Sequence, residues 1–162
     1  MKLKEGKDIT VAAKNIRAEL REAFPGVKFS VQCSRFAGGN AINISWTDGP
    51  TDESVQAITR KYAQGTFDGM TDSYDYNKGE ARVFNERHGG ARWVHTSREH
   101  SAELVTAAIE AIAEHYHPCA DPPPTPADWR NGETMTISPT LNGAQADSWQ
   151  ALIHRQLAAM AA

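Results

Sequence analysis

The side chains with the most chemical potential lie in one short acidic stretch, residues 65–76 (GTFDGMTDSYDY). Asp68, Asp72 and Asp75 are four and three residues apart in it, and Asp48 stands before the preceding predicted helix. Converging carboxylates can hold Mg²⁺ or Ca²⁺, although this spacing is not that of an EF-hand loop. One hypothesis is therefore a metal-dependent enzyme acting on nucleic acid, with Asp48, Asp68 and Asp72 around the ion.

The same aspartates also suit a structural role. Asp side chains start turns and cap segments by accepting hydrogen bonds from nearby backbone N–H groups. In that interpretation Phe67 and Met70 anchor the loop to the core, and the acidic side chains remain outside it. This second interpretation predicts no metal in the stretch.

Histidine is abundant late in the chain but does not form a metal motif. Two of the histidines, His115 and His117, are two residues apart on a predicted helix and so point about 200° apart. They could share a metal ion only if the helix frayed at Pro118. We therefore expect exposed histidines near a helix carboxyl end. The sequence contains no G-x-S-x-G element and no phosphate-binding glycine loop, and it predicts no catalytic residue set and no cofactor. The histidines in this part of the chain are His88, His95, His100, His115 and His117, and Cys119 follows them.

A recognition role fits the acidic stretch better than catalysis does. Tyrosines and carboxylates on an ordered loop suit binding of a basic protein surface, or mimicry of phosphate charge. The expected surface combines the 66–76 loop with the turn at 47–51. Its candidate contact residues are Trp46, Asp48, Asp68, Asp72, Tyr74 and Tyr76.

Charge argues against nucleic acid as the main partner. The 162 residues carry a net charge of −3, whereas phosphate-binding surfaces normally show a basic excess. Residues 1–40 nevertheless hold eight Lys and Arg against four Asp and Glu, a balance of +4. A weak DNA-binding protein is therefore a further alternative, and it would use Lys14, Arg17, Arg21, Lys28 and Arg35.

The first half of the chain predicts a helix, two strands and a second helix. Residues 8–24 show apolar positions at helical spacing, and Pro25-Gly26 ends them. Residues 27–33 and 41–47 alternate apolar and polar side chains, so they predict paired antiparallel strands with one wet face. Cys33 and Trp46 fall on the apolar face. Thr51 is placed to cap the next helix, whose buried stripe would be Val55, Ile58 and Tyr62.

From residue 66 to residue 80 the apolar residues follow neither helical nor strand spacing, which predicts a long loop. Residues 82–87 and 91–97 are weaker strand candidates, and a helix with its apolar stripe over 104–116 follows them. The predicted order is α-β-β-α-β-β-α. The fold class is therefore α+β, with an antiparallel sheet packed against helices, followed by a proline-rich linker and a C-terminal helix.

Composition changes at residue 118. Five of the eight prolines lie in 118–126 (PCADPPPTP), which predicts an extended linker that joins neither sheet nor helix. A short extended piece at 135–138 and a helix from Asp147, with a capping box to Gln150, are expected beyond it. The expected domains are 1–117, a linker at 118–146 and a helix at 147–162. That helix would dock on the domain or bind a partner, and we favour docking or a homo-oligomer.

The sequence also favours a location. It has two separated cysteines, no apolar signal region in MKLKEGKD, and no apolar run of the ~20 residues that span a bilayer. We therefore expect a cytoplasmic protein without a membrane partner.

Four segments together resemble a known family. They are AFPGVKFSV (23–31), ISWTDGPT (44–51), GTFDGMTDSYDY (65–76) and TSREHS (96–101). As a set they resemble the large polyvalent protein-associated domain, number twenty-nine in that series, over about residues 8–117. The tail from Pro118 has no counterpart in this resemblance.

The resemblance implies a setting but no mechanism. Such domains occur in large proteins of phages and conjugative elements and in short plasmid proteins, and polyvalent proteins are thought to enter with the incoming DNA and counter host defence. No catalytic set is established for this domain. The implied role is a non-enzymatic accessory or interaction module of a mobile genetic element, whose protein partner would be a host-defence or conjugation component.

Overall fold

The computed structural model describes residues 2–115, 122–141, 144–145 and 147–161. Contacts within the chain form two compact units, Met1–Glu99 and His100–Ala162, which we describe separately. This division falls before the boundary expected at residue 117, because the helix that follows residue 100 packs against the C-terminal helix.

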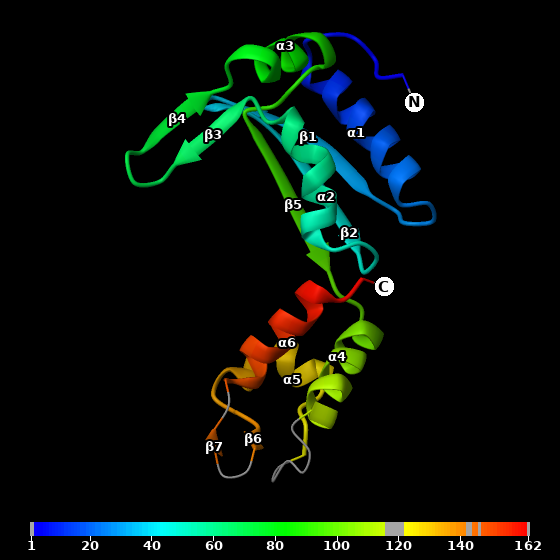
Figure 1. The fold of residues 1–162 in the computed structure, drawn as a ribbon, viewed down its shortest axis with the longest axis vertical. Helices are drawn as coiled ribbons and strands as arrows, with labels where there is room; N and C mark the ends of the chain where they lie inside the picture. Colours follow the sequence, from blue (N-terminus) through cyan, green and yellow to red (C-terminus); the bar gives the residue numbers. More distant parts are fainter. Residues whose placement is uncertain (1, 116–121, 142–143, 146, 162) are drawn as a thin grey trace. The chain divides into compact units, whose positions relative to one another are not determined.

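The first unit is an α+β unit, as the sequence predicted (Figure 1). Its elements are α1 (Ile9–Ala23), β1 (Ser30–Phe36), β2 (Gly39–Thr47), α2 (Asp52–Thr59), the 3₁₀ turn η1 (Arg60–Tyr62), β3 (Gly65–Asp68), β4 (Ser73–Tyr76), α3 (Gly79–His88) and β5 (Trp93–Glu99).

A three-stranded sheet in the order β1-β2-β5 forms the framework of this unit. β1 pairs antiparallel with β2, as predicted. β5 pairs parallel with β2, so the sheet is mixed rather than wholly antiparallel. The reason is topological: α2, the β3–β4 hairpin and α3 separate β2 from β5, and a connection of this length lets the chain return in the same direction.

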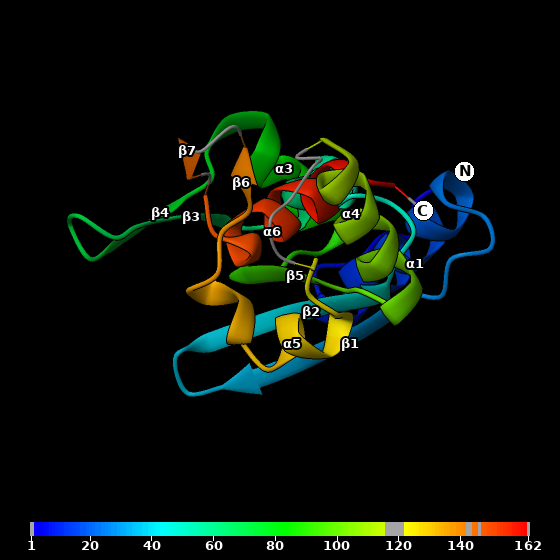
Figure 2. The same ribbon diagram turned by 90° about the horizontal axis from the view of Figure 1, so that it is seen from below.

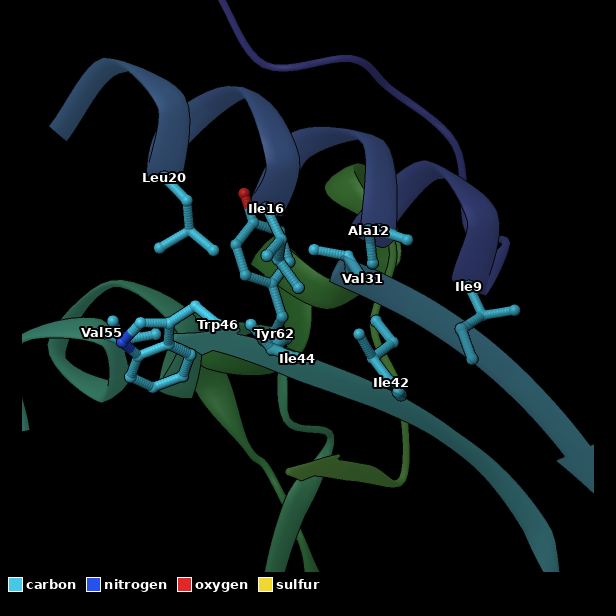
Figure 3. Close-up of a cluster of buried hydrophobic side chains, with 12 residues drawn as sticks. Ile9, Ala12, Ile16, Leu20, Val31, Ile42, Ile44, Trp46, Val55 and Tyr62 are labelled. Atoms are coloured by element: carbon cyan, nitrogen blue, oxygen red, sulfur yellow. The ribbon is translucent and has the colours of Figure 1, made fainter. Parts of the chain in front are cut away.

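Helix α1 covers one face of the sheet and supplies much of the core. Ile9, Ala12, Ile16 and Leu20 recur at helical spacing and are at most 2% exposed. In Figure 3 these side chains point from α1 toward Ile42, Ile44 and Trp46 of β2. The remaining buried members of this cluster are Ala13, Val31, Val55, Tyr62 and Ala91.

Local capping defines the start of both helices, and the Thr51 cap of α2 was predicted. The Asp8 carboxylate accepts a hydrogen bond from the Thr10 backbone N–H at the start of α1. Thr51 caps α2 by accepting from the Ser54 N–H at 3.3 Å. Asp52 lies in the first turn of α2, where the helix dipole favours negative charge.

The first strand differs from the prediction at both ends. β1 begins at Ser30 rather than Val27 and continues to Phe36, where a tight turn leads into β2. Val31 is buried, but Cys33 is exposed, so its predicted place in the core is wrong. The reason is that Cys33 lies on an edge strand and lines an open groove between β1 and α1.

Two segments between residues 65 and 88 also differ from the prediction. The expected loop at 66–80 contains the β3–β4 hairpin, and the expected strand at 82–87 lies within helix α3. In α3, contacts between residues four apart replace strand alternation. Phe84 packs on His88 with ring centroids 5.0 Å apart, and Arg82 pairs with Glu86 at 2.9 Å.

The second unit is built mainly from helices. Its elements are α4 (Ala102–His115), α5 (Pro126–Arg130), the 3₁₀ turn η2 (Glu133–Met135), the short strands β6 (Thr140–Leu141) and β7 (Ala144–Gln145), and α6 (Trp149–Ala159). Helix α6 docks on α4 of the same chain, and together they bury Leu104, Val105, Ala108, Ile109, Ile112, Trp149, Leu152, Ile153 and Leu157.

Several predictions for the tail need correction. Ser148, not Asp147, caps α6 by accepting from the Ala151 N–H, and Asp147 pairs with Arg155 at 2.7 Å. Pro126 lies inside the expected linker but begins α5, because the first helical position needs no N–H donor. Met135 ends a 3₁₀ turn instead of starting an extended piece. Residues 118–121 of the expected linker lie outside the described residues, as do His117 and Cys119.

Candidate interaction site

The acidic stretch singled out in the sequence forms a separate two-stranded hairpin. β3 and β4 pair antiparallel from Gly65 with Tyr76 to Asp68 with Ser73. In Figures 1 and 2 the hairpin projects away from the three-stranded sheet. Gly65 is required at its base, because a Cβ atom there would clash with the Asp75 carbonyl oxygen.

Asp68 organises the tip of the hairpin. Its carboxylate accepts from the Met70 backbone N–H at 2.9 Å and from the Thr71 hydroxyl at 3.0 Å. These hydrogen bonds lower the pKa of Asp68, because they favour the charged form. Asp72 completes the turn with a positive φ of 48°, a conformation that Asp tolerates better than most residues. Asp68 is thus a turn-forming residue, as the structural interpretation predicted.

An aromatic cluster attaches the hairpin to the start of β5. Tyr74 packs edge-on against Trp93, with ring centroids 5.2 Å apart, and Phe67 packs on the same indole at 5.6 Å. The Tyr74 hydroxyl donates to the Arg92 carbonyl at 2.5 Å, and the Arg92 guanidinium lies 4.9 Å from the Tyr74 ring centroid. Burial raises the pKa of Tyr74, with a further contribution from Tyr76.

The outer side of the hairpin remains exposed. Met70 is 97% exposed, Tyr76 58% and Phe67 45%. The expectation that Phe67 and Met70 anchor the segment to the core is therefore wrong for Met70, whereas Phe67 packs on Trp93 and is only half covered. The segment 65–76 also contains three Asp and no Lys or Arg. It combines exposed apolar side chains with a single sign of charge.

The structure does not join the turn after β2 to this hairpin. Trp46 is 3% exposed, and its indole N–H donates to the Pro50 carbonyl at 3.0 Å, so it is a core residue and not a contact residue. Asp48 follows the carboxyl end of β2, whereas the hairpin packs on Trp93, which pairs with Ala41 at the other end. The expected six-residue surface reduces to Asp68, Asp72, Tyr74 and Tyr76.

The separation of Asp48 from the hairpin also removes the hypothetical metal centre. Among the residues that the structure describes, no group of three or more His, Cys, Asp or Glu could hold a metal ion. Asp48, Asp68 and Asp72, all of them described, therefore do not form the shared site that the enzyme hypothesis required. In the same part of the chain, none of the helices is long and apolar enough to cross a membrane.

A pocket of about 480 Å³, lined mainly by residues with polar or charged side chains, lies at the base of the hairpin, where β4 runs into α3. Asn85 is 7% exposed and organises its wall. Its amide nitrogen donates to the Lys61 carbonyl at 2.8 Å, and its amide oxygen accepts from Asn77 at 3.1 Å. The residues that line the pocket are Lys7, Gln64, Tyr76, Asn77, Arg82, Asn85 and Glu86.

Sequence reasoning missed most of this pocket and the packing role of Trp93. The available signal was weak. Thr66-Phe67-Asp68 and Ser73-Tyr74-Asp75-Tyr76 do alternate, around a Gly-containing turn, but only over three and four residues. Runs this short do not separate strand from loop without knowledge of the surface that they pack on.

The first unit is thus an α+β domain from which the β3–β4 hairpin projects. The chain matches the family described as Large polyvalent protein associated domain 29 over residues 8–101, which is more than half of its length. It belongs to that family. No curated protein and no solved structure matches it.

Proposed function

We propose that this chain is a non-enzymatic interaction module that recognises a basic surface on another protein through the β3–β4 hairpin. We further propose that it serves a mobile genetic element, plasmid or phage, by assisting its establishment or by countering host defence. Membership of the polyvalent-protein-associated family supports an accessory role. The partner would be a host-defence or conjugation component.

The composition and exposure of the hairpin carry the interaction proposal. Met70 and Tyr76 leave apolar surface in water, and no stability is gained from that exposure. Asp72 and Asp75 make no side-chain hydrogen bond or ion pair among the described residues, so their charges are available to a partner. Interfaces commonly combine an aromatic or methionine anchor with charges that steer the encounter.

Affinity capture from a bacterial lysate tests this proposal. Two hairpin variants separate apolar contact from charge: Met70→Ser with Tyr76→Ser, and Asp72→Asn with Asp75→Asn. We expect wild type to retain a basic protein, the first variant to lose it, and the second to hold it more weakly with less dependence on salt. Asp68 is left unchanged because it builds the turn.

Val83→Ser is the matched control. Val83 is 62% exposed on α3, outside the hairpin, so its replacement removes a similar exposed apolar group. The control should retain the same protein as wild type. The proposal is wrong if both hairpin variants retain the same partner as wild type, or if Val83→Ser loses it equally.

A further inference from the structure

We propose a second binding site on the first unit: the outer edge of β1, which would accept an extended segment with acidic side chains at alternate positions. β1 is an edge strand of the β1-β2-β5 sheet. Edge strands present unpaired backbone groups on which another strand can add. The proposal concerns the opposite edge of the sheet from β5, and so it is independent of the hairpin.

The register of β1 determines which of its backbone groups face outward. Phe36 and Gly39 close a two-residue turn and form a hydrogen-bonded pair. Every second residue before Phe36, namely Ser34, Gln32 and Ser30, therefore also turns its backbone N–H and C=O toward β2. Val31, Cys33 and Arg35 then turn their N–H and C=O groups to the outer edge. The Arg17 guanidinium donates to the Val31 carbonyl, which is consistent with this orientation.

A groove follows the same edge. It encloses about 640 Å³ and is lined by Thr10, Ala13, Lys14, Arg17, Val31, Gln32 and Cys33. A smaller hollow of about 270 Å³ shares Arg17 with it and is lined further by Arg21, Val27, Lys28 and Phe29. The space therefore runs between the side of α1 and the free edge of β1, where an added strand would lie.

The side of the groove formed by α1 is positively charged. Lys14, Arg17 and Arg21 are three and four residues apart, so they lie along one face of the helix. The side chains of Lys14 and Arg21 make no hydrogen bond or ion pair among the described residues, and Arg17 has donors beyond the one that bonds Val31. These are also the cations expected to hold DNA, together with Lys28 and with Arg35, which instead pairs with Asp8 at 2.8 Å.

The spacing of these cations suits the repeat of a strand. Lys14 and Arg21 are seven residues apart, which is about 10.5 Å along a helix. Alternate side chains of a strand are about 6.8 Å apart and point to the same face. Carboxylates at two or three successive alternate positions would therefore meet this row while the backbone pairs with Cys33, Arg35 and the N–H of Val31, whose carbonyl already accepts from Arg17.

The cations of α1 also determine which partners the edge of β1 would accept. A second copy of β1 would bring its own cations to the edge, and like charges oppose that pairing. A nucleic acid could bind the cations but would leave the outward backbone groups of β1 unpaired. The combination of a free strand edge and a cationic wall therefore favours an acidic extended peptide over either alternative.

Peptide binding to the full chain tests the site. The probe is a labelled nine-residue peptide that alternates Val and Glu. Its control has the same composition with the four Glu contiguous, and a fifteen-residue oligothymidine tests for nucleic acid. We expect the alternating peptide to bind best by fluorescence anisotropy. We also expect it to slow amide hydrogen exchange at Val31, Cys33 and Arg35, but not at Gln32 or Ser34, whose amides already pair with β2.

Two variants locate the binding. Lys14→Glu with Arg21→Glu should weaken the alternating peptide by at least about tenfold. Lys7→Glu with Lys78→Glu makes the same change of charge elsewhere on the unit and should bind as wild type. Cys33→Pro removes one outward N–H, which an edge strand tolerates, and should abolish binding with the unfolding transition retained.

Each result of these binding and exchange measurements either supports or overturns strand addition at β1. Binding of the alternating peptide with exchange protection at the three outward amides supports the proposal. Equal binding of the contiguous-Glu peptide or of oligothymidine would show a cationic patch without strand addition and would overturn it. So would the absence of peptide binding, or unchanged exchange at the three amides.

Discussion

Strand β2 and the β3–β4 hairpin belong to one unit and both alternate along the chain, but they use alternation differently. β2 buries Ile42, Ile44 and Trp46 under α1 and α2. The hairpin buries none of its eight strand residues, and its side chains are half-buried or exposed. A two-stranded hairpin alone is marginally stable in water. The difference indicates that β2 stabilises the unit, whereas the hairpin depends on the Tyr74–Trp93 contact and presents surface.

The largest expected effect comes from Trp46. Trp46→Ala should lower the free energy of unfolding by about 3–5 kcal/mol, because it removes a buried indole and leaves a cavity. Urea unfolding measures this loss, and Val83→Ala, at an exposed position, should stay within about 0.5 kcal/mol of wild type. If Trp46→Ala kept its stability but lost a partner, Trp46 would be a contact residue and the contrast between β2 and the hairpin would fail.

The buried Tyr62 gives the next largest effect. Its hydroxyl donates to the Glu19 carboxylate at 2.7 Å, and Lys61 also pairs with Glu19 at 2.5 Å. Tyr62→Phe should cost about 1.5–3 kcal/mol at neutral pH, the range for hydrogen bonds to charged groups. This contact joins η1 to α1 and therefore tests the core, not the hairpin.

The Tyr62 contribution should depend on alkaline pH. Burial, followed by the Glu19 hydrogen bond and charge, raises the pKa of Tyr62 above its ordinary value of 10.0. The folded form thus holds its proton more tightly than the unfolded chain. The contribution is complete below pH 10 and is lost as pH rises from there toward the folded pKa. Urea unfolding between pH 7 and 11 should show wild type and Tyr62→Phe converging above pH 10, and parallel curves would contradict this.

Gly65 tests the hairpin by itself. Gly65→Ala should cost more than about 1 kcal/mol, because the new Cβ would clash with the Asp75 carbonyl oxygen. Gly69→Ala is the matched control, since the nearest heavy atom to its Cβ is the Phe67 ring at 3.9 Å. Thermal unfolding and the NMR signals of Tyr74 and Trp93 measure the change. Equal effects of the two substitutions would show that the hairpin is not held closely at its base.

The sequence predicted the parts of the fold that local signals determine. The Thr51 cap, the β1–β2 hairpin and the α1 stripe were all confirmed, because each depends on residues close in the chain. Strand β5 was predicted with its start two residues early, but its parallel partner was not foreseen. Pairing of β5 with β2 depends on how α2, the β3–β4 hairpin and α3 fold between residues 47 and 93. A local sequence pattern does not contain that information.

The candidate site was less predictable than the fold. The turn role of Asp68 follows from ordinary Asp chemistry and was foreseen. The pocket wall around Asn85 depends on the Lys61 carbonyl 24 residues away, and on Gly90, where a Cβ would lie 3.1 Å from the Asn85 amide. Trp46 was assigned both to the apolar face and to the binding surface. Its burial, which depends on α1 and α2 covering β2, decides between them.

The smallest expected effect sharpens the contrast between core and hairpin most directly. Asp68→Ala removes the hydrogen bonds to Met70 and Thr71 at the tip, so amide exchange at Met70 should become faster while the urea midpoint of the unit stays nearly unchanged. Asp75→Ala removes the same charge from β4 without a side-chain hydrogen bond and should alter neither quantity.

The acid dependence of this local effect also has a defined sign. The pKa of Asp68 is lowered below its ordinary value of 3.8, chiefly by the Met70 N–H and then by the Thr71 hydroxyl. Its contribution to the tip is therefore present above pH 3.8 and is lost as pH falls through the lower folded pKa. Titration of the carboxyl by NMR measures this pKa. If protonation of Asp68 shifted the global unfolding midpoint as well, the hairpin would share in the stability of the core, and the two regions would not be separable.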